Sequence, residues 1–75
     1  MTDKQAIAWI KNELPECGSV IVTKTLHDTE DGAVHESYTA SIFKYGSTNI
    51  AGRGEEATVT QAAMLAVAEY IRGDR

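Results

Sequence analysis

The stretch AGRGEEAT, residues 51–58, joins the last expected strand to the last expected helix and is the strongest structural signal in the chain. Gly52 and Gly54 allow backbone conformations that are closed to residues with a Cβ, which suits a turn. Thr58 is followed three residues later by Gln61, the spacing of a capping box. The stretch therefore predicts a glycine turn leading into a capped helix.

A second capping box, Thr2 with Gln5, predicts a first helix over residues 3–13 that ends before Pro15. Trp9 lies off the apolar stripe of this helix, at the margin of the core or on the surface. The apolar residues at helical spacing should face the core, and they are Ile7, Ile10 and Leu14, with Ala6 at the edge.

Three segments rich in β-branched and aromatic residues follow, and we expect strands over residues 19–26, 34–45 and 48–52. The acidic connection between the first two strands contains Asp31-Gly32, which favours a type I′ turn. Gly46-Ser47 favours a type II′ turn before the third strand.

The last helix is expected over residues 59–72, with Leu65 as the one large apolar residue away from its core face. That core face is predicted to contain Val59, Ala63, Met64, Val67, Tyr70 and Ile71. Both helices need an apolar surface, and a three-stranded antiparallel sheet offers one face for this purpose. The prediction is an α+β, two-layer α-β-β-β-α domain formed by residues 1–75, with both helices packed on one face of the sheet.

Composition limits the function classes. The chain has 75 residues, eleven acids, seven bases and a net charge of −4, which disfavours a general polyanion binder. The single cysteine, Cys17, excludes an internal disulfide and fits a reducing compartment. No segment is long and apolar enough to span a membrane, so we expect a cytoplasmic protein with no membrane partner.

The element order and several motifs resemble the double-stranded RNA-binding domain. The likeness lies in a loop similar to Gly-Pro-x-His, an aromatic-x-apolar-x-apolar strand, a Gly-x-Gly and an alanine-rich helix. In this chain these are Gly32-Ala33-Val34-His35, then Tyr38, Ala40 and Ile42, then Gly52-Arg53-Gly54, then Ala62-Ala63. The resemblance implies the α-β-β-β-α fold. It also implies RNA contacts from the first helix, the loop after the first strand and a lysine cluster at the second helix.

The chain departs from the family at those contact regions. Glu55 and Glu56 lie where the lysine cluster is expected, and the loop bears acids but no Lys or Arg: Asp28, Glu30, Asp31 and Glu36. Carboxylates repel phosphate, so we expect the capacity to bind double-stranded RNA to be lost.

Catalytic and metal sites have weak support. Cys17 with His27 or His35 lacks an orienting third group, so we expect no enzyme. The acidic loop resembles a calcium loop, but its glycine comes one position early and the distal glutamate is absent, so we expect no metal and no cofactor. His35 is either a contact residue or a solvated loop side chain.

The expected function is a small non-enzymatic protein-interaction module, an adaptor or inhibitor that uses an acidic surface toward a protein partner, which could be basic. Arg53 is either a partner contact or an ion-pair partner of the neighbouring glutamates. Trp9, Leu65 and Phe43 are candidate interface residues, and the sheet face with Phe43 could pair two copies. The predicted partner-binding residues are Trp9, Asp28, Glu30, Asp31, His35, Arg53, Glu55, Glu56 and Leu65.

Two alternatives stay open. A chain of this size and charge resembles small inhibitors encoded by bacteriophages, some of which mimic nucleic acid. A residual double-stranded nucleic-acid binder would instead use the basic residues Lys4, Lys11, Lys24, Lys44 and Arg53.

Overall fold

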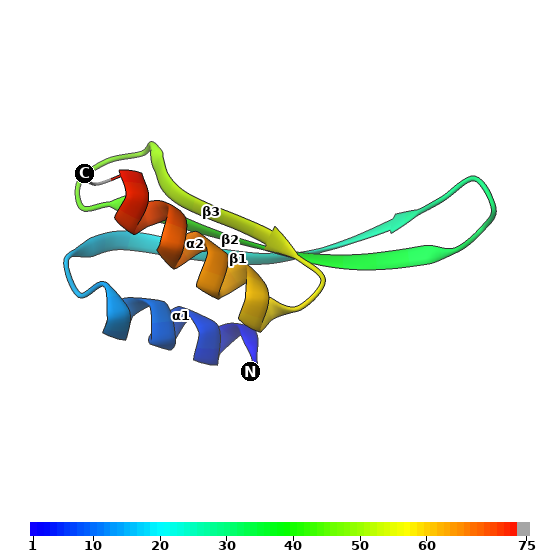
Figure 1. Cartoon of the computed structure of the whole chain (residues 1–75), viewed down its shortest axis with the longest axis horizontal. Coiled ribbons are helices and arrows are strands. Elements are labelled where there is room, and N and C mark those ends of the chain that lie inside the picture. The colour runs from blue at the N-terminus through cyan, green and yellow to red at the C-terminus, as the bar shows by residue number, and fades with distance from the viewer. Residues whose placement is uncertain (74–75) are drawn as a thin grey trace.

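The computed structural model describes residues 1–73 and has two layers. Its elements are α1 (Asp3–Glu13), β1 (Cys17–Asp28), β2 (Val34–Lys44), β3 (Ile50–Glu56) and α2 (Val59–Gly73). The strands form one antiparallel sheet in the order β1-β2-β3, and both helices pack against the same face of it (Figure 1). The predicted α+β architecture is confirmed.

The core lies between the helices and the inner face of the sheet, with Ile10 and Ile42 as its largest fully buried side chains. Much of the remaining core consists of alanines. Its buried members are Ala6, Ile10, Leu14, Cys17, Ala40, Ile42, Val59, Ala62, Ala63, Ala66, Val67 and Tyr70. Small side chains on α2 let this helix approach the sheet closely.

The face of α2 that is buried differs from the predicted core face by a rotation about the helix axis. Met64 is 56% exposed and Ile71 is 50% exposed, whereas Ala62 and Ala66 are completely buried. The helix turns its alanines to the sheet because the strand beneath it, β3, comes too close for larger side chains. Hydrophobicity alone favoured Met64 over Ala62, and the backbone distance reversed that preference.

The prediction that Gly52 and Gly54 form a turn was also wrong. Both lie inside β3, and positive φ among residues 1–73 occurs only at Gly32 and Gly46. A Cβ on Gly52 would lie 2.4 Å from the carbonyl oxygen of Ala66, and one on Gly54 would lie 2.2 Å from that of Ala62. The glycines thus provide space for α2, and β3, predicted over residues 48–52, runs on to Glu56.

The predicted capping box is complete at α1, whereas at α2 Gln61 Oε1 accepts from the Thr58 hydroxyl, at 3.2 Å. The Gln5 N–H donates to Thr2 Oγ1 at 3.1 Å, and the Thr2 N–H donates to Gln5 Oε1 at 2.8 Å, which completes the first capping box. At α2 the Gln61 N–H donates to Thr58 Oγ1 at 3.2 Å. Each cap satisfies a backbone donor that the helix itself leaves free.

The two turns differ from the predicted types. Only Gly32 has positive φ in the first turn, and the Thr29 N–H donates to the Ala33 carbonyl at 2.9 Å. This is the three-residue loop with a terminal left-handed glycine rather than a type I′ turn. Gly46 occupies the third position of the Lys44–Ser47 turn, where a type II turn requires positive φ.

A two-stranded arm projects from the body of the domain. The ladder between β1 and β2 continues to Asp28 opposite Val34, but β3 ends opposite Tyr38. We call residues 25–37 the hairpin arm (Figure 1). It gives the molecule extents of 43 × 22 × 18 Å. Because β1 was predicted to end at residue 26, His27 and Asp28 were wrongly placed in a loop.

Candidate functional site

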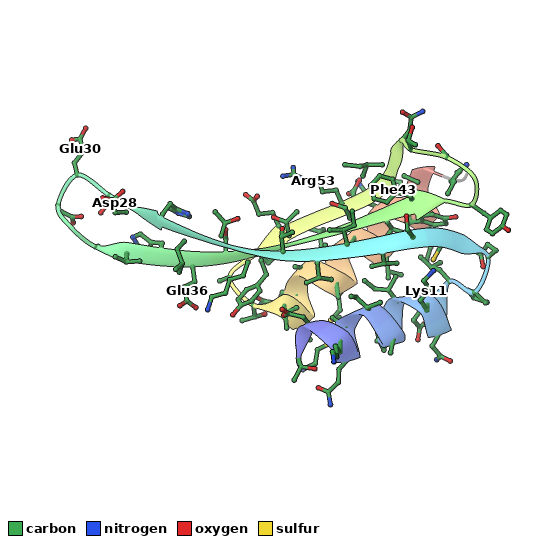
Figure 2. All side chains as sticks on the ribbon, turned by 180° about the vertical axis from the view of Figure 1, so that it is seen from behind. Lys11, Asp28, Glu30, Glu36, Phe43 and Arg53 are labelled. Atoms are coloured by element: carbon green, nitrogen blue, oxygen red, sulfur yellow. The ribbon has the colours of Figure 1, made fainter. Side chains whose placement is uncertain are left out.

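The tip of the hairpin arm presents three carboxylates, those of Asp28, Glu30 and Asp31 (Figure 2). Asp31 helps to shape the loop, because it accepts hydrogen bonds from the Thr29 hydroxyl and from the Ala33 N–H, the latter at 3.3 Å. The Thr29 hydroxyl and then the Ala33 N–H hold the pKa of the Asp31 carboxyl below its usual value. Glu30 is exposed at the far end of the arm, available to a partner.

Two histidines lie side by side on the arm. His35 is directly opposite His27 in the β1–β2 ladder, and their rings stack with centroids 5.9 Å apart. Both side chains are exposed, on the sheet face opposite to that of Asp28. His35 is thus part of an exposed strand rather than of a mobile loop.

The end of β3 forms a separate polar group on the open face of the sheet. Arg53 Nη2 lies 3.4 Å from Glu55 Oε2, and the Thr39 hydroxyl donates to the same oxygen at 3.2 Å. Arg53 therefore has the ion-pair partner that was one of its two predicted roles. Figure 2 shows Arg53 over the body of the sheet, far from Glu30. Glu56 lies on the other face, opposite Tyr38.

The predicted acidic residues do not form one continuous patch. Asp28 is opposite Val34 and Glu56 is opposite Tyr38, so the two acids lie on either side of β2 and are offset along it by four residue steps, or about 13 Å. Glu36 is held near Lys24, at 3.5 Å. The structure thus places the carboxylates in an arm group and a β3 group.

The three apolar residues predicted to form an interface come from three different elements, α1, α2 and β2. Trp9 is half-buried and packs against the core from α1, and Leu65 lies on α2 at the border of exposure, with its Cβ close to the Gly54 backbone. Phe43 is half-buried opposite Ile50, on the open face. Phe43 thus lies on the open face of the sheet, whereas Trp9 and Leu65 belong to the helical layer on the other face.

Sequence reasoning missed two exposed apolar residues on the hairpin arm. Leu26 is 61% exposed and Val34 is 66% exposed, and both lie on the sheet face that bears the helices in the body. Their neighbours on that face are charged, with Lys24 and Asp28 beside Leu26 and Glu36 beside Val34, and this was the signal that could have found them. The helices end before the arm begins, so that face has nothing over it there.

Cys17 and the two histidines are not brought together. Cys17 is buried at the start of β1, whereas His27 lies ten residues further along the same strand, about 33 Å away. This separation excludes a thiol–imidazole pair within one chain. Within residues 1–73 there is no detected pocket and no cluster of three metal-ligating side chains. No helix in that part is long and apolar enough to cross a bilayer.

The α-β-β-β-α topology is consistent with the double-stranded RNA-binding fold that the sequence resembles. No family model, curated protein or solved structure matches the chain.

Proposed function

We propose that this protein is a small non-enzymatic interaction module, an adaptor or inhibitor, that presents its hairpin arm to a basic protein partner. One observation supports this proposal above others. The arm contains four carboxylates, no Lys and no Arg: Asp28, Glu30, Asp31 and Glu36. Removing these four from the eleven acids of the chain leaves seven acids against seven bases. The four carboxylates of the hairpin arm thus account for the net charge of −4.

The exposure of the arm supports the same conclusion. Residues 23–36 are all exposed, and they bury little surface within the chain. An isolated two-stranded hairpin is marginally stable in water. A partner would supply the contacts that this chain does not. Complementary charge would speed the encounter and select basic surfaces.

Loss of double-stranded RNA binding is part of the proposal. In the resembled family the loop between the first two strands enters the minor groove, and here that position bears the acidic tip. Several basic residues are already near carboxylates, with Lys24 beside Glu36 and Arg53 beside Glu55. A nucleic-acid mimic acting on a nucleic-acid-binding enzyme is one form that the inhibitor role could take.

The test is capture of a partner from a native cell extract with a photo-crosslinking side chain at position 30, compared with one at Met64 on α2. We expect a specific adduct at position 30 only. The paired reversal Asp31→Lys with Glu36→Lys, which leaves the crosslinker at position 30 and Asp28 in place, should abolish it. The matched control, Glu13→Lys with Glu16→Lys, makes the same change in charge at exposed sites outside the arm and should leave the adduct unchanged. If the adduct formed equally well in the variant with the reversed arm charges, the proposal would be contradicted.

A second measurement addresses nucleic acid directly. Labelled duplex RNA and duplex DNA are titrated with the protein at about 50 mM salt, where electrostatic binding is strong. We expect no saturable binding. Micromolar binding that weakens with added salt would favour a residual nucleic-acid binder instead.

A further inference from the structure

The outer edge of β1 is open along the hairpin arm. The strand order β1-β2-β3 leaves β1 without a neighbour on one side in the described part of the chain. The Thr29 N–H points inward to Ala33, and antiparallel backbone groups alternate in direction. The N–H and C=O groups of Lys24, Leu26 and Asp28 therefore point outward, where another strand could pair with them.

The side chains along this edge are self-complementary. Lys24 and Asp28 are placed symmetrically about Leu26, and all three share one face of the sheet. If a second β1 paired antiparallel with a two-fold axis at Leu26, each Lys24 would face Asp28 of the other copy. The two Leu26 side chains would then face each other across the axis.

We propose that the partner of this edge is a second copy of the chain, joined through antiparallel pairing of the two β1 strands centred on Leu26. Asp28 is the only acid in β1, so this register alone sets Lys24 opposite a carboxylate of the second β1, in addition to Glu36 of its own chain at 3.5 Å. A register centred on Lys24 would set two ammonium groups opposite each other, which destabilises a strand pair. Charge complementarity thus favours a second copy of the chain as the partner of this edge, and it favours the register centred on Leu26.

The shape of the arm accommodates this arrangement. Pairing over residues 24–28 places the two bodies at opposite ends of the shared ladder, and the tip of each copy then lies beside the last body residues of the other β1, with Glu30 opposite Val22. Leu26 is 61% exposed in one chain and would be covered by its counterpart. A lysine in an edge strand commonly prevents such pairing. Here Asp28, at the matching distance, supplies the opposite charge. The interface is small, so the dimer is a weak one.

This inference goes beyond the proposed function and can fail separately from it. It uses the backbone edge of β1 with Lys24, Leu26 and Asp28. The photo-crosslinking test uses position 30 with Asp31 and Glu36, which lie outside the paired residues 24–28.

Sedimentation velocity on the full chain tests the dimer. We expect reversible association of the native protein at a concentration on the order of 100 μM to 1 mM. Lys24→Asp places Asp opposite Asp28, and Asp28→Lys places Lys opposite Lys24. Each variant alone should weaken association by at least about tenfold. An equimolar mixture of the two variants makes both cross-strand pairs attractive, so it should associate at least as well as the native protein.

Two control variants make the same changes in charge on α1. They are Lys4→Asp and Glu13→Lys, and both should associate like the native chain. The double swap Lys24→Asp with Asp28→Lys should also dimerise, and circular dichroism confirms that each variant is folded. A native protein that stays monomeric at about 1 mM would overturn the proposal. So would single variants that associate normally, or a mixture that fails to recover.

The register has its own test. Facing residues in a hydrogen-bonded pair have Cα atoms about 5.5 Å apart, which suits a disulfide. Leu26→Cys should therefore cross-link in oxidised glutathione, which is reduced as the two thiols join. Ile21→Cys, exposed on the opposite sheet face, is the control. Equal rates of cross-linking for the two variants would overturn the register and with it the proposal.

Discussion

Gly54 lies against Ala62 so closely that a Cβ on the glycine would be 2.2 Å from the alanine carbonyl oxygen. This contact sets the distance between β3 and α2. Gly52 and Ala66 repeat it one helical turn further along, at 2.4 Å. The pairing of small residues on both elements explains why α2 turns alanines rather than Met64 to the sheet.

Substitution of Gly54 by Ala should therefore be costly. The added methyl group cannot be accommodated without moving α2, and overpacking of this kind costs about 1–3 kcal/mol of unfolding free energy. Urea denaturation followed by circular dichroism measures the loss. Gly73→Ala is the control, because a Cβ there meets its nearest atom at an ordinary 3.7 Å. Equal stability of Gly54→Ala and the native chain would disprove the close packing.

Thr58 should stabilise α2 through its cap. Replacing it with Ala removes the acceptor for the Gln61 N–H and should lower the unfolding free energy by about 1 kcal/mol. Thr58→Ser keeps a hydroxyl at the same place and should lose much less. The same denaturation experiment compares them. A neutral Thr58→Ala variant would mean that water satisfies this donor equally well.

The hairpin arm should be dispensable for folding. Replacing residues 26–36 with Asn-Gly joins Thr25 to Ser37, which already face each other, through a tight turn. No residue of the buried core is removed. We expect the unfolding free energy to change by less than about 1 kcal/mol. In the native chain, hydrogen exchange should be faster in the arm than at β2 in the body. Global unfolding of the shortened chain would refute this separation.

Asp31 should titrate at a lower pH than an ordinary aspartate. Its ionised form accepts the Thr29 and Ala33 hydrogen bonds, and these lower the pKa of its carboxyl. The order that this carboxylate gives to the loop is therefore present above the usual aspartate pKa and is lost as pH falls through the lowered one. Carboxyl carbon shifts in an NMR titration measure the midpoint. Thr29→Val removes the hydroxyl and should raise the midpoint toward the usual value, whereas Thr39→Val should leave it unchanged.

Local signals in the sequence predicted the elements well. The capping boxes placed the start of α1 at Asp3 and that of α2 at Val59, because each cap involves only side chains within three residues of the helix start. Ala40 and Ile42, which match the apolar positions of the family's strand motif, are both completely buried. The strand ends were less predictable, since pairing with β2 up to Tyr38, rather than local propensity, carries β3 on to Glu56.

The sequence predicted which residues belong to the candidate site, but it did not predict how these residues are arranged in space. The acids of residues 28–36 and Glu55 with Glu56 were expected together, but Glu55 lies on the opposite sheet face from Asp28, Glu36 and Glu56. Exposure of Leu26 and Val34 was missed, although Lys24, Asp28 and Glu36 share their sheet face and are charged. Whether a helix covers that face depends on where the helices end in space.

The sequence by itself determined the order of the elements, the helix caps, the inner face of the sheet and the excess of acid in residues 25–37. These follow from backbone propensity, short-range hydrogen bonds and alternation, which act between residues near one another in the chain. Only the tertiary structure decided the rotation of α2, the purpose of Gly52 and Gly54, and the projection of the hairpin arm. Those features depend on how closely distant segments approach, and packing rather than local preference sets that distance.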